Sequence, residues 1–428
     1  MEYKIFKIFI FLILFLTSGN IFNSRDEYIS GKENGMDFII DSFITDESEY
    51  DTDVVKKYFS DGIDKDEMIS IINKDVDYVQ KNGEYIPINY NFEKKLHYSE
   101  IEEMLFNMNN LDIVSLERLY KTVDNRYIYG LEIGRGERVI YIDANIHAGE
   151  VGNTVIIMRF LSELLNEYNN GNKDIKNKLK SVKLAVIPSI NPDGYEIYNF
   201  GKESINNKDL WIYKNYESID INHLKCNANG IDINRNFPSQ NAGLYYKSNK
   251  LLKSVSLEKT TKRGTYFGGN ILGSENETKA CIYFMLKHYK KTYAYLDMHS
   301  QGRVLYNGKP NLSYEFNKTS RRFAEFISSY NKYKVHNLSA EEVGEGNDGT
   351  ATDFMAELAH DFKYSTKTHR LSSNRYVENE TSLMYNYPVV TIETLTTYSR
   401  DTSLFKKEYY DLKIRNILFD MLDCNFIN

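Results

Sequence analysis

Two apolar runs of this sequence end on residues that can bind a metal ion. The run in segment 141–150 is followed by His147 and, three positions later, by Glu150. The run in segment 294–299 is followed by His299. Two histidines and one carboxylate can hold zinc while a further coordination position stays open for a water molecule. We therefore expect these three residues to bind one zinc ion per chain.

Each of these residues also has an ordinary structural explanation. His147 and Glu150 could cap the helix that follows, because a carboxylate near a helix start favours the helix dipole. His299 could be a structural histidine at the end of a strand. The zinc hypothesis gains its weight from the combination, since the chain contains only 8 His and two of them follow buried runs.

A third apolar run, residues 389–393, ends on Glu393. A carboxylate at the end of a buried strand needs a partner or has a raised pKa. The structural alternative is an ion pair with a nearby Lys or Arg. Beside a zinc-bound water, Glu393 would instead act as the general base.

The elements that must position these residues start at about residue 96. Buried strands alternate with amphipathic helices, a pattern typical of an α/β domain with a mostly parallel or mixed sheet. The expected strands are 138–144, 182–190, 292–299 and 387–394, and the main helices are 151–168 and 275–289. We read Asn191-Pro-Asp-Gly194 as a turn after the second strand. Ligands collect at the carboxyl ends of strands in such sheets.

Asn234 and Arg235 lie in a loop-like segment, residues 230–237. The planar guanidinium group of arginine binds carboxylates through two parallel hydrogen bonds. A surface arginine beside turn-forming asparagines is the alternative interpretation.

Composition limits the remaining classes of function. The net charge is −7, and residues 24–90 carry 17 Asp or Glu against 7 Lys or Arg. The remainder is about neutral and has no basic stripe, which argues against nucleic acid as a partner. The 3 Cys are too few for a disulfide framework. We expect a monomer with no membrane association beyond its N-terminal segment.

The N-terminal segment has the layout of a secretory signal. Lys4 and Lys7 precede an apolar run over residues 8–17, and the small residues Ser18 and Gly19 follow. We predict a signal peptide at 1–19, an acidic region or propeptide at 20–95, and a catalytic domain at 96–428. The expected location is secreted or at the cell surface or cell wall.

These motifs, in this order, resemble the zinc carboxypeptidase A-like metallopeptidase family. The resemblance covers about residues 96–428. It implies a twisted mixed β-sheet flanked by helices. It implies that His147, Glu150 and His299 bind zinc and that Glu393 is the general base. It also implies that Asn234 and Arg235 bind a substrate carboxylate.

The sequence departs from the digestive members of the family near the reaction centre. Ala148 and Gly149 stand where the family often has an arginine. Ile212 follows Leu210-Trp211 where the family usually has an arginine that donates to the oxyanion. Lys214, or zinc alone, would have to take that role.

Other departures concern the substrate. Thr352 stands where the floor of the specificity pocket is expected. A hydroxyl group there suits a polar side chain of the substrate better than an aromatic one. No tyrosine clearly matches the mobile clamp, for which Tyr376, Tyr385 and Tyr387 compete. Residues 360–381 read as an inserted rim loop. Segment 297–302 resembles bacterial γ-D-glutamyl-diamino acid peptidases.

Together with the N-terminal signal layout, the resemblance implies an exported zinc metallopeptidase acting on a peptide or muropeptide substrate. The favoured bond joins γ-D-glutamate to a diamino acid of a peptidoglycan stem peptide. A secreted general carboxypeptidase is the second hypothesis. A zinc-free protein that binds peptide ends is the third, and Ile212 is the feature that favours it.

Overall fold

The computed structural model describes residues 70–71, 73–238, 263–264, 266–269, 271–307, 312–336, 349–363 and 380–426. The predicted signal peptide, most of the acidic region, and Tyr376 lie outside these ranges. None of the helices in the described ranges is both long enough and apolar enough to span a membrane.

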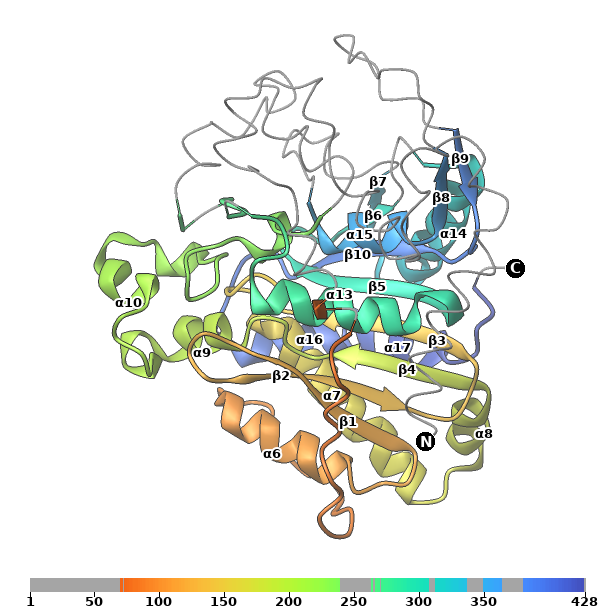
Figure 1. Ribbon diagram of the computed structural model, residues 1–428. Helices are drawn as coiled ribbons and strands as arrows, with labels where there is room; N and C mark the ends of the chain where they lie inside the picture. Colours follow the sequence, from red (N-terminus) through yellow and green to blue (C-terminus); the bar gives the residue numbers. More distant parts are fainter. Residues whose placement is uncertain are drawn as a thin grey trace.

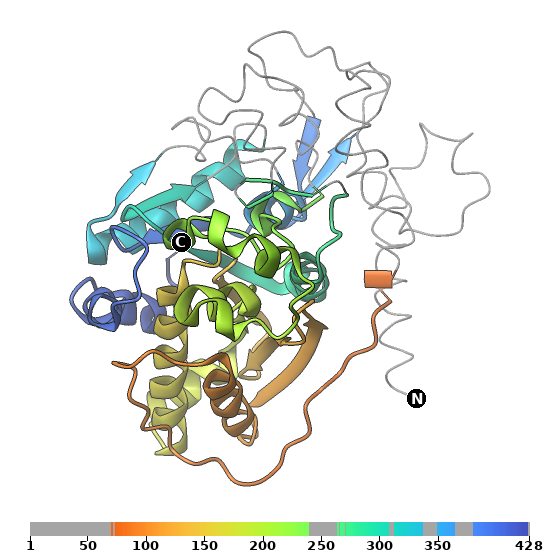
Figure 2. The same ribbon diagram turned by 90° about the vertical axis from the view of Figure 1, so that its left-hand side faces the viewer.

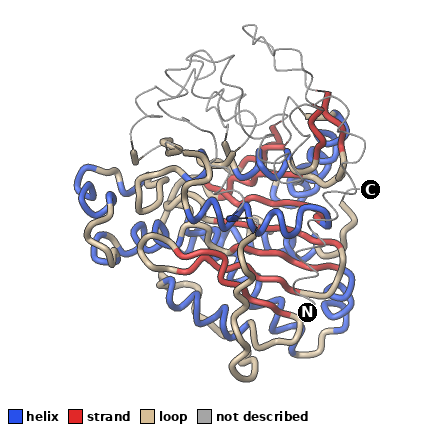
Figure 3. Tube along the Cα trace, in the orientation of Figure 1, coloured by secondary structure: helices blue, strands red, loops and turns tan. Residues whose placement is uncertain are grey.

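An eight-stranded mixed sheet forms the centre of the molecule, with strand order β1-β2-β4-β3-β5-β10-β6-β7 (Figures 1 and 3). Its strands are β1 (Val114–Lys121), β2 (Tyr127–Ile133), β3 (Arg138–Ala144), β4 (Val182–Ile187), β5 (Thr292–Ser300), β6 (Val304–Asn307), β7 (Lys334–His336) and β10 (Val389–Thr394). The central strands β4, β3, β5 and β10 are mutually parallel. Their carboxyl ends therefore meet at one edge.

Helices cover both faces of the sheet. They are α6 (Tyr98–Met108), α7 (Val151–Asn169), α8 (Lys173–Ser181), α9 (Pro192–Phe200), α10 (Trp211–Asn215), α13 (Asn276–His288), α14 (Tyr314–Asn331), α15 (Ala351–Glu357), α16 (Thr402–Tyr410) and α17 (Ile414–Met421). A separate two-stranded sheet pairs β8 (His360–Lys363) with β9 (Glu380–Leu383). These strands lie at the two ends of segment 360–381, which was expected to be a rim loop.

The two faces of β3 explain this layering, because successive side chains of a strand point to opposite sides. Ile140 and Ile142 pack in the core that contains α7, α16 and α17. Val139 and Tyr141 pack in the core that contains α13 and α15. A strand that is apolar on both faces must lie between two layers of helices. The predicted fold, a twisted mixed sheet flanked by helices, is confirmed.

The strand at 138–144 has the predicted bounds, and the helix predicted at 151–168 extends by one residue to Asn169. The interpretation of Asn191-Pro-Asp-Gly194 as a turn was wrong, because these residues begin α9. The Asn191 side chain accepts a hydrogen bond from the Gly194 N–H (2.8 Å), and Pro192 takes the first helical position. Both features favour the start of a helix.

The chain before α6 runs in an extended path around the outside of the domain (Figure 2). It adds to the edge of the sheet, where Val79 N donates to Leu116 O and Arg118 N donates to Asp77 O. Residues 73–95 therefore lie against the same body as the central sheet.

Candidate metal centre and active site

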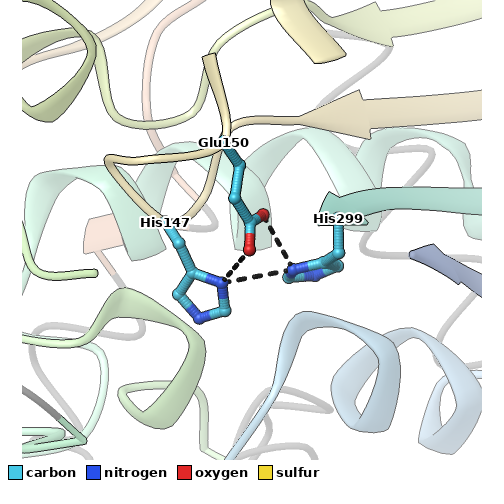
Figure 4. Close-up of side chains that lie close together, drawn as sticks. All are labelled: His147, Glu150 and His299. Atoms are coloured by element: carbon cyan, nitrogen blue, oxygen red, sulfur yellow. Dashed lines mark hydrogen bonds and ion pairs between the residues drawn. The ribbon is translucent and has the colours of Figure 1, made fainter. Parts of the chain in front are cut away.

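His147, Glu150 and His299 converge at the carboxyl ends of β3 and β5 (Figure 4). His147 Nδ1 lies 2.8 Å from Glu150 Oε1, and His299 Nδ1 lies 3.1 Å from Glu150 Oε2. The two Nδ1 atoms are 3.3 Å apart. All three side chains are buried. The structure thus brings together the three residues predicted to bind zinc.

The loop after β3 places the first two of these residues. Asn145 adopts a left-handed conformation (φ 56°), and its side-chain amide donates to His147 O at 2.9 Å. Glu150 then occupies the N-cap position of α7. The tight turn directs both ligand candidates toward His299 on the neighbouring strand.

The far side of each imidazole ring faces an aspartate. His147 Nε2 lies 3.4 Å from Asp232 Oδ1, and His299 Nε2 lies 3.0 Å from Asp297 Oδ1. A carboxylate beside Nε2 favours a proton on that atom and leaves the Nδ1 lone pair for a metal ion, although neither Nε2 atom makes a hydrogen bond of good geometry within the described residues. Two such lone pairs 3.3 Å apart repel each other unless a cation or a proton lies between them. This donor set fits zinc.

Glu393 lies on β10, directly beside His299 in the parallel register. Its Oε2 atom is buried and has no hydrogen-bond partner among the residues that the structure describes. Burial raises the pKa of Glu393 to about 7, although His299 and Lys225 act to lower it. A carboxyl group near neutrality is suited to accept and return a proton. No ion pair of Glu393 with a Lys or Arg occurs among the described residues, which disfavours the structural alternative.

Asn234 and Arg235 lie in a short 3₁₀ helix (Ile233–Arg235) and are both buried. The Asn234 side-chain oxygen accepts from Ala351 N at 2.9 Å, which ties this loop to the start of α15. Arg235 Nη1 donates to Asn234 O at 2.7 Å. The guanidinium group stands 5.7 Å from the ring of Tyr266.

Thr352 lies beside the strands that carry His299 and Glu393. Its Oγ1 is 3.4 Å from Asp297 Oδ2 and 3.3 Å from Thr391 Oγ1. Asp297 and Thr391 precede His299 and Glu393 by two residues, so their side chains share the same face of the sheet. The surroundings of Thr352 are therefore polar.

Lys225 is a functional candidate that the sequence analysis missed. It is partly exposed, and it lies close enough to Glu393 to lower the pKa of that carboxyl. Its Nζ stands 4.8 Å from the Tyr266 ring. Interactions with Tyr266, Asp232 and Glu150 raise the pKa of Lys225 despite its burial, so the ammonium stays charged.

Lys214, the cation that the sequence suggested for the oxyanion, is a surface residue. Its side chain is 58% exposed and pairs with Asp209 at 3.3 Å, whereas Ile212 is buried in the core. Lys214 therefore lies at the surface beside Asp209, and its role as a cation for the oxyanion stays a prediction. The signal that could have found Lys225 is its position seven residues before Asp232, in the same loop as Arg235.

Two aromatic residues near the ligands were also missed. Tyr398 places its hydroxyl 3.4 Å from Glu150 Oε1, and Tyr266 lies between Lys225 and Arg235. Tyr387, one of the tyrosines proposed as a clamp, is instead buried with its hydroxyl donating to Met355 O. Tyr385 packs edge-on against Tyr289.

Comparisons with known proteins agree with this geometry. The chain is 30% identical over 161 residues to the carboxypeptidase N catalytic chain of Rattus norvegicus, which covers 35% of this chain and 32% of that protein. It is 27% identical over 215 residues to the γ-D-glutamyl-L-diamino acid endopeptidase 1 of Lysinibacillus sphaericus, covering 49% of this chain and 51% of that protein. The chain thus spans about a third of the first relative and about half of the second.

Solved structures show the same fold. Thrombin-activatable fibrinolysis inhibitor superposes with a TM-score of 0.54 at 19% identity, and carboxypeptidase A of Helicoverpa armigera with 0.53 at 15% identity. Each comparison covers 78% of this chain and 75% of the other. The family model described as zinc carboxypeptidase matches residues 101–394, which is more than half of the sequence. The chain therefore belongs to the zinc carboxypeptidase family.

Proposed function

We propose that this protein is an exported zinc metallopeptidase that hydrolyses a peptide bond next to a residue with a free carboxylate. The observation that carries the proposal is the convergence of two imidazole Nδ1 atoms and one carboxylate beside Glu393. The predicted signal peptide at 1–19 supports export to the cell surface or cell wall. The protein would act as a monomer on a peptide or muropeptide.

His147, Glu150 and His299 would hold the zinc ion. Zinc bound there would polarise the scissile carbonyl and make a water molecule more acidic. Glu393 would take the proton of that water through its buried Oε2 and return it to the leaving amine. A carboxyl group with a pKa near neutrality can do both.

Two cations would bind the charged parts of the substrate. The Lys225 ammonium would face the oxygen of the scissile carbonyl, where negative charge develops during attack. Arg235 would bind the free carboxylate on the leaving side, with Asn234 holding its loop against α15. A cation supplied by Lys225 would weaken the case for a peptide-binding protein without activity, since Ile212 is the feature that favours that alternative.

The favoured substrate is a peptidoglycan stem peptide, cut between γ-D-glutamate and a diamino acid. The polar surroundings of Thr352, with Asp297 and Thr391 in reach, favour a polar arm over an aromatic ring. The relationship to an endopeptidase named for this bond also supports the proposal. A secreted general carboxypeptidase is the second candidate, favoured by the carboxypeptidase relatives.

Mass spectrometry of the products and kcat/KM measurements distinguish the two candidates. We expect kcat/KM on a γ-D-glutamyl-diaminopimelate peptide to exceed that on a peptide ending in Phe. An aromatic ring packed against the side-chain oxygen atoms of Thr352, Asp297 and Thr391 would remove them from water without offering a hydrogen bond, at a cost of roughly 1–3 kcal/mol, or up to about a hundredfold in selectivity. If the Phe peptide is the better substrate by about tenfold, the general carboxypeptidase replaces the peptidoglycan proposal.

A further inference from the structure

Gly149, between two ligand candidates, leaves space that aromatic rings fill. A Cβ atom at this position would lie 3.2 Å from Tyr398 Cδ2 and 3.4 Å from Tyr198 Cε2. A larger residue would therefore have to displace one of these rings. Tyr398 and Tyr198 form an aromatic wall immediately beside Glu150, to which Tyr398 also directs its hydroxyl.

Arg400 packs its guanidinium group over the Tyr198 ring of this wall. Its guanidinium carbon is 4.0 Å from the centre of the Tyr198 ring. Its Nε donates to Tyr198 O at 2.5 Å and its Nη1 donates to Asn222 Oδ1 at 3.0 Å. Both acceptors are neutral, so they orient the group without compensating its charge.

Several other arginines of this protein have carboxylate partners. Arg126 pairs with Asp193, Arg135 with Asp112, and Arg415 with Glu163. Within the described ranges, Arg400 makes no ion pair with any carboxylate, and its side chain is partly exposed. A fixed, partly exposed guanidinium on an aromatic ring is preorganised to bind a planar anion such as a carboxylate.

A path of contacts connects Arg400 with Arg235 past the metal ligands. From Arg235 it runs over Tyr266 to Lys225. The neighbouring Leu224 O accepts from Gly149 N at 2.7 Å, and the rings of Tyr398 and Tyr198 occupy the space beside Gly149 where a Cβ atom would stand. The two arginines therefore stand at opposite ends of the path. Gly149, between the ligand candidates His147 and Glu150, lies along this path between the two arginines, so a substrate whose leaving side is bound by Arg235 would extend its acyl side toward Arg400.

We propose that Arg400 binds a carboxylate of the substrate residue on the acyl side and so determines specificity there. This inference depends on the proposed peptidase function and extends it. A γ-linked D-glutamyl residue carries a free α-carboxylate on that side, and an ordinary glutamate carries its side-chain carboxylate there. A residue with an amide in the same place offers no charge to the guanidinium group.

Two matched pairs of substrates test the proposal on the full protein. One pair has γ-D-glutamate or γ-D-isoglutamine before diaminopimelate, and the other has Glu or Gln before the same C-terminal residue. We expect kcat/KM for the acid to exceed that for the amide by about tenfold, the value of one charge-assisted hydrogen bond. Arg400→Gln should remove this preference, and Arg400→Lys should retain part of it.

Arg135→Gln is the control, because Arg135 pairs with Asp112 away from this wall. It should keep the wild-type preference. A wild-type enzyme that cleaves acid and amide equally well, or an Arg400→Gln variant that still prefers the acid, overturns the role of Arg400. If only the pair with Glu or Gln is cleaved, the peptidoglycan substrate is refuted. The preference for Glu over Gln in that pair then tests the role of Arg400. Cleavage of neither pair refutes both proposals.

Discussion

At the scale of single residues, the site depends on the groups behind the metal-ligand candidates as much as on the ligands. Asp232 and Asp297 each lie within ion-pair distance of one imidazole, on the side opposite to the metal position. His147, Arg235 and Lys225 keep the pKa of Asp232 below its usual range even though burial alone would raise it. The loop that carries Arg235 is thereby coupled to His147.

Glu393→Gln should retain the fold and bind zinc but lose turnover. The amide has nearly the same shape and cannot accept the proton of the attacking water. A general base contributes roughly 10²- to 10⁴-fold to the rate, and we expect a decrease of that size in kcat. In the wild type, kcat/KM should rise with pH as Glu393 loses its proton and should level off above the pKa of this group. That pKa should be at or below about 7, since bound zinc can only lower the pKa of Glu393. Near-wild-type kcat in a zinc-loaded variant would assign the base to another residue.

Lys225→Met should decrease kcat with little change in zinc content. The ammonium is expected to act on the charge that develops at the carbonyl oxygen, and loss of one such donor costs about 10²- to 10³-fold. Lys214→Met is the matched control, because Lys214 pairs with Asp209 at the surface. Equal activities of the two variants would refute the role of Lys225.

At the scale of elements, asparagine side chains fasten residues 79–88 to the catalytic domain. Asn166 of α7 accepts from Ile88 N (2.9 Å) and donates to Ile88 O (2.8 Å). Asn107 makes the same pair of bonds to the backbone of Ile86. Lys81 donates to the carbonyl groups of Asn109, Leu111 and Val114, close to the end of α6. The domain boundary predicted at 95/96 stays a prediction, and these contacts, with Ile71 buried in the core, favour one that precedes residue 70.

A truncation series should locate this boundary. Removal of residues 1–69 keeps the buried core residue Ile71 and should leave the thermal unfolding midpoint unchanged, whereas removal of 1–95 should lower it markedly. Asn166→Ala in the full chain should cost roughly 1–3 kcal/mol of stability, because Ile88 loses both backbone partners. Asn177→Ala, at an exposed position of α8, controls for the higher helix propensity of alanine. Equal stability of the two truncated proteins would favour the boundary at 95/96.

At the scale of the whole molecule, the parts of the site at strand ends could be predicted from the sequence. His147, His299 and Glu393 each end an apolar run, and parallel strands bring such ends to one edge. Lys225 and Tyr398 lie in irregular segments, where no periodicity shows which way a side chain points. Their positions depend on how two distant loops fold over Gly149. Asn191-Pro-Asp-Gly194 has the composition of a turn, and only the chain that follows makes it a helix start.

The metal site is the central claim, and elemental analysis tests it most directly. The wild-type protein should contain about one zinc per chain. The double variant His147→Ala, His299→Ala loses two of three ligands and should contain almost none, while its circular dichroism spectrum stays that of a folded α/β protein. Full zinc occupancy in the double variant would contradict the assignment of these residues as the ligands.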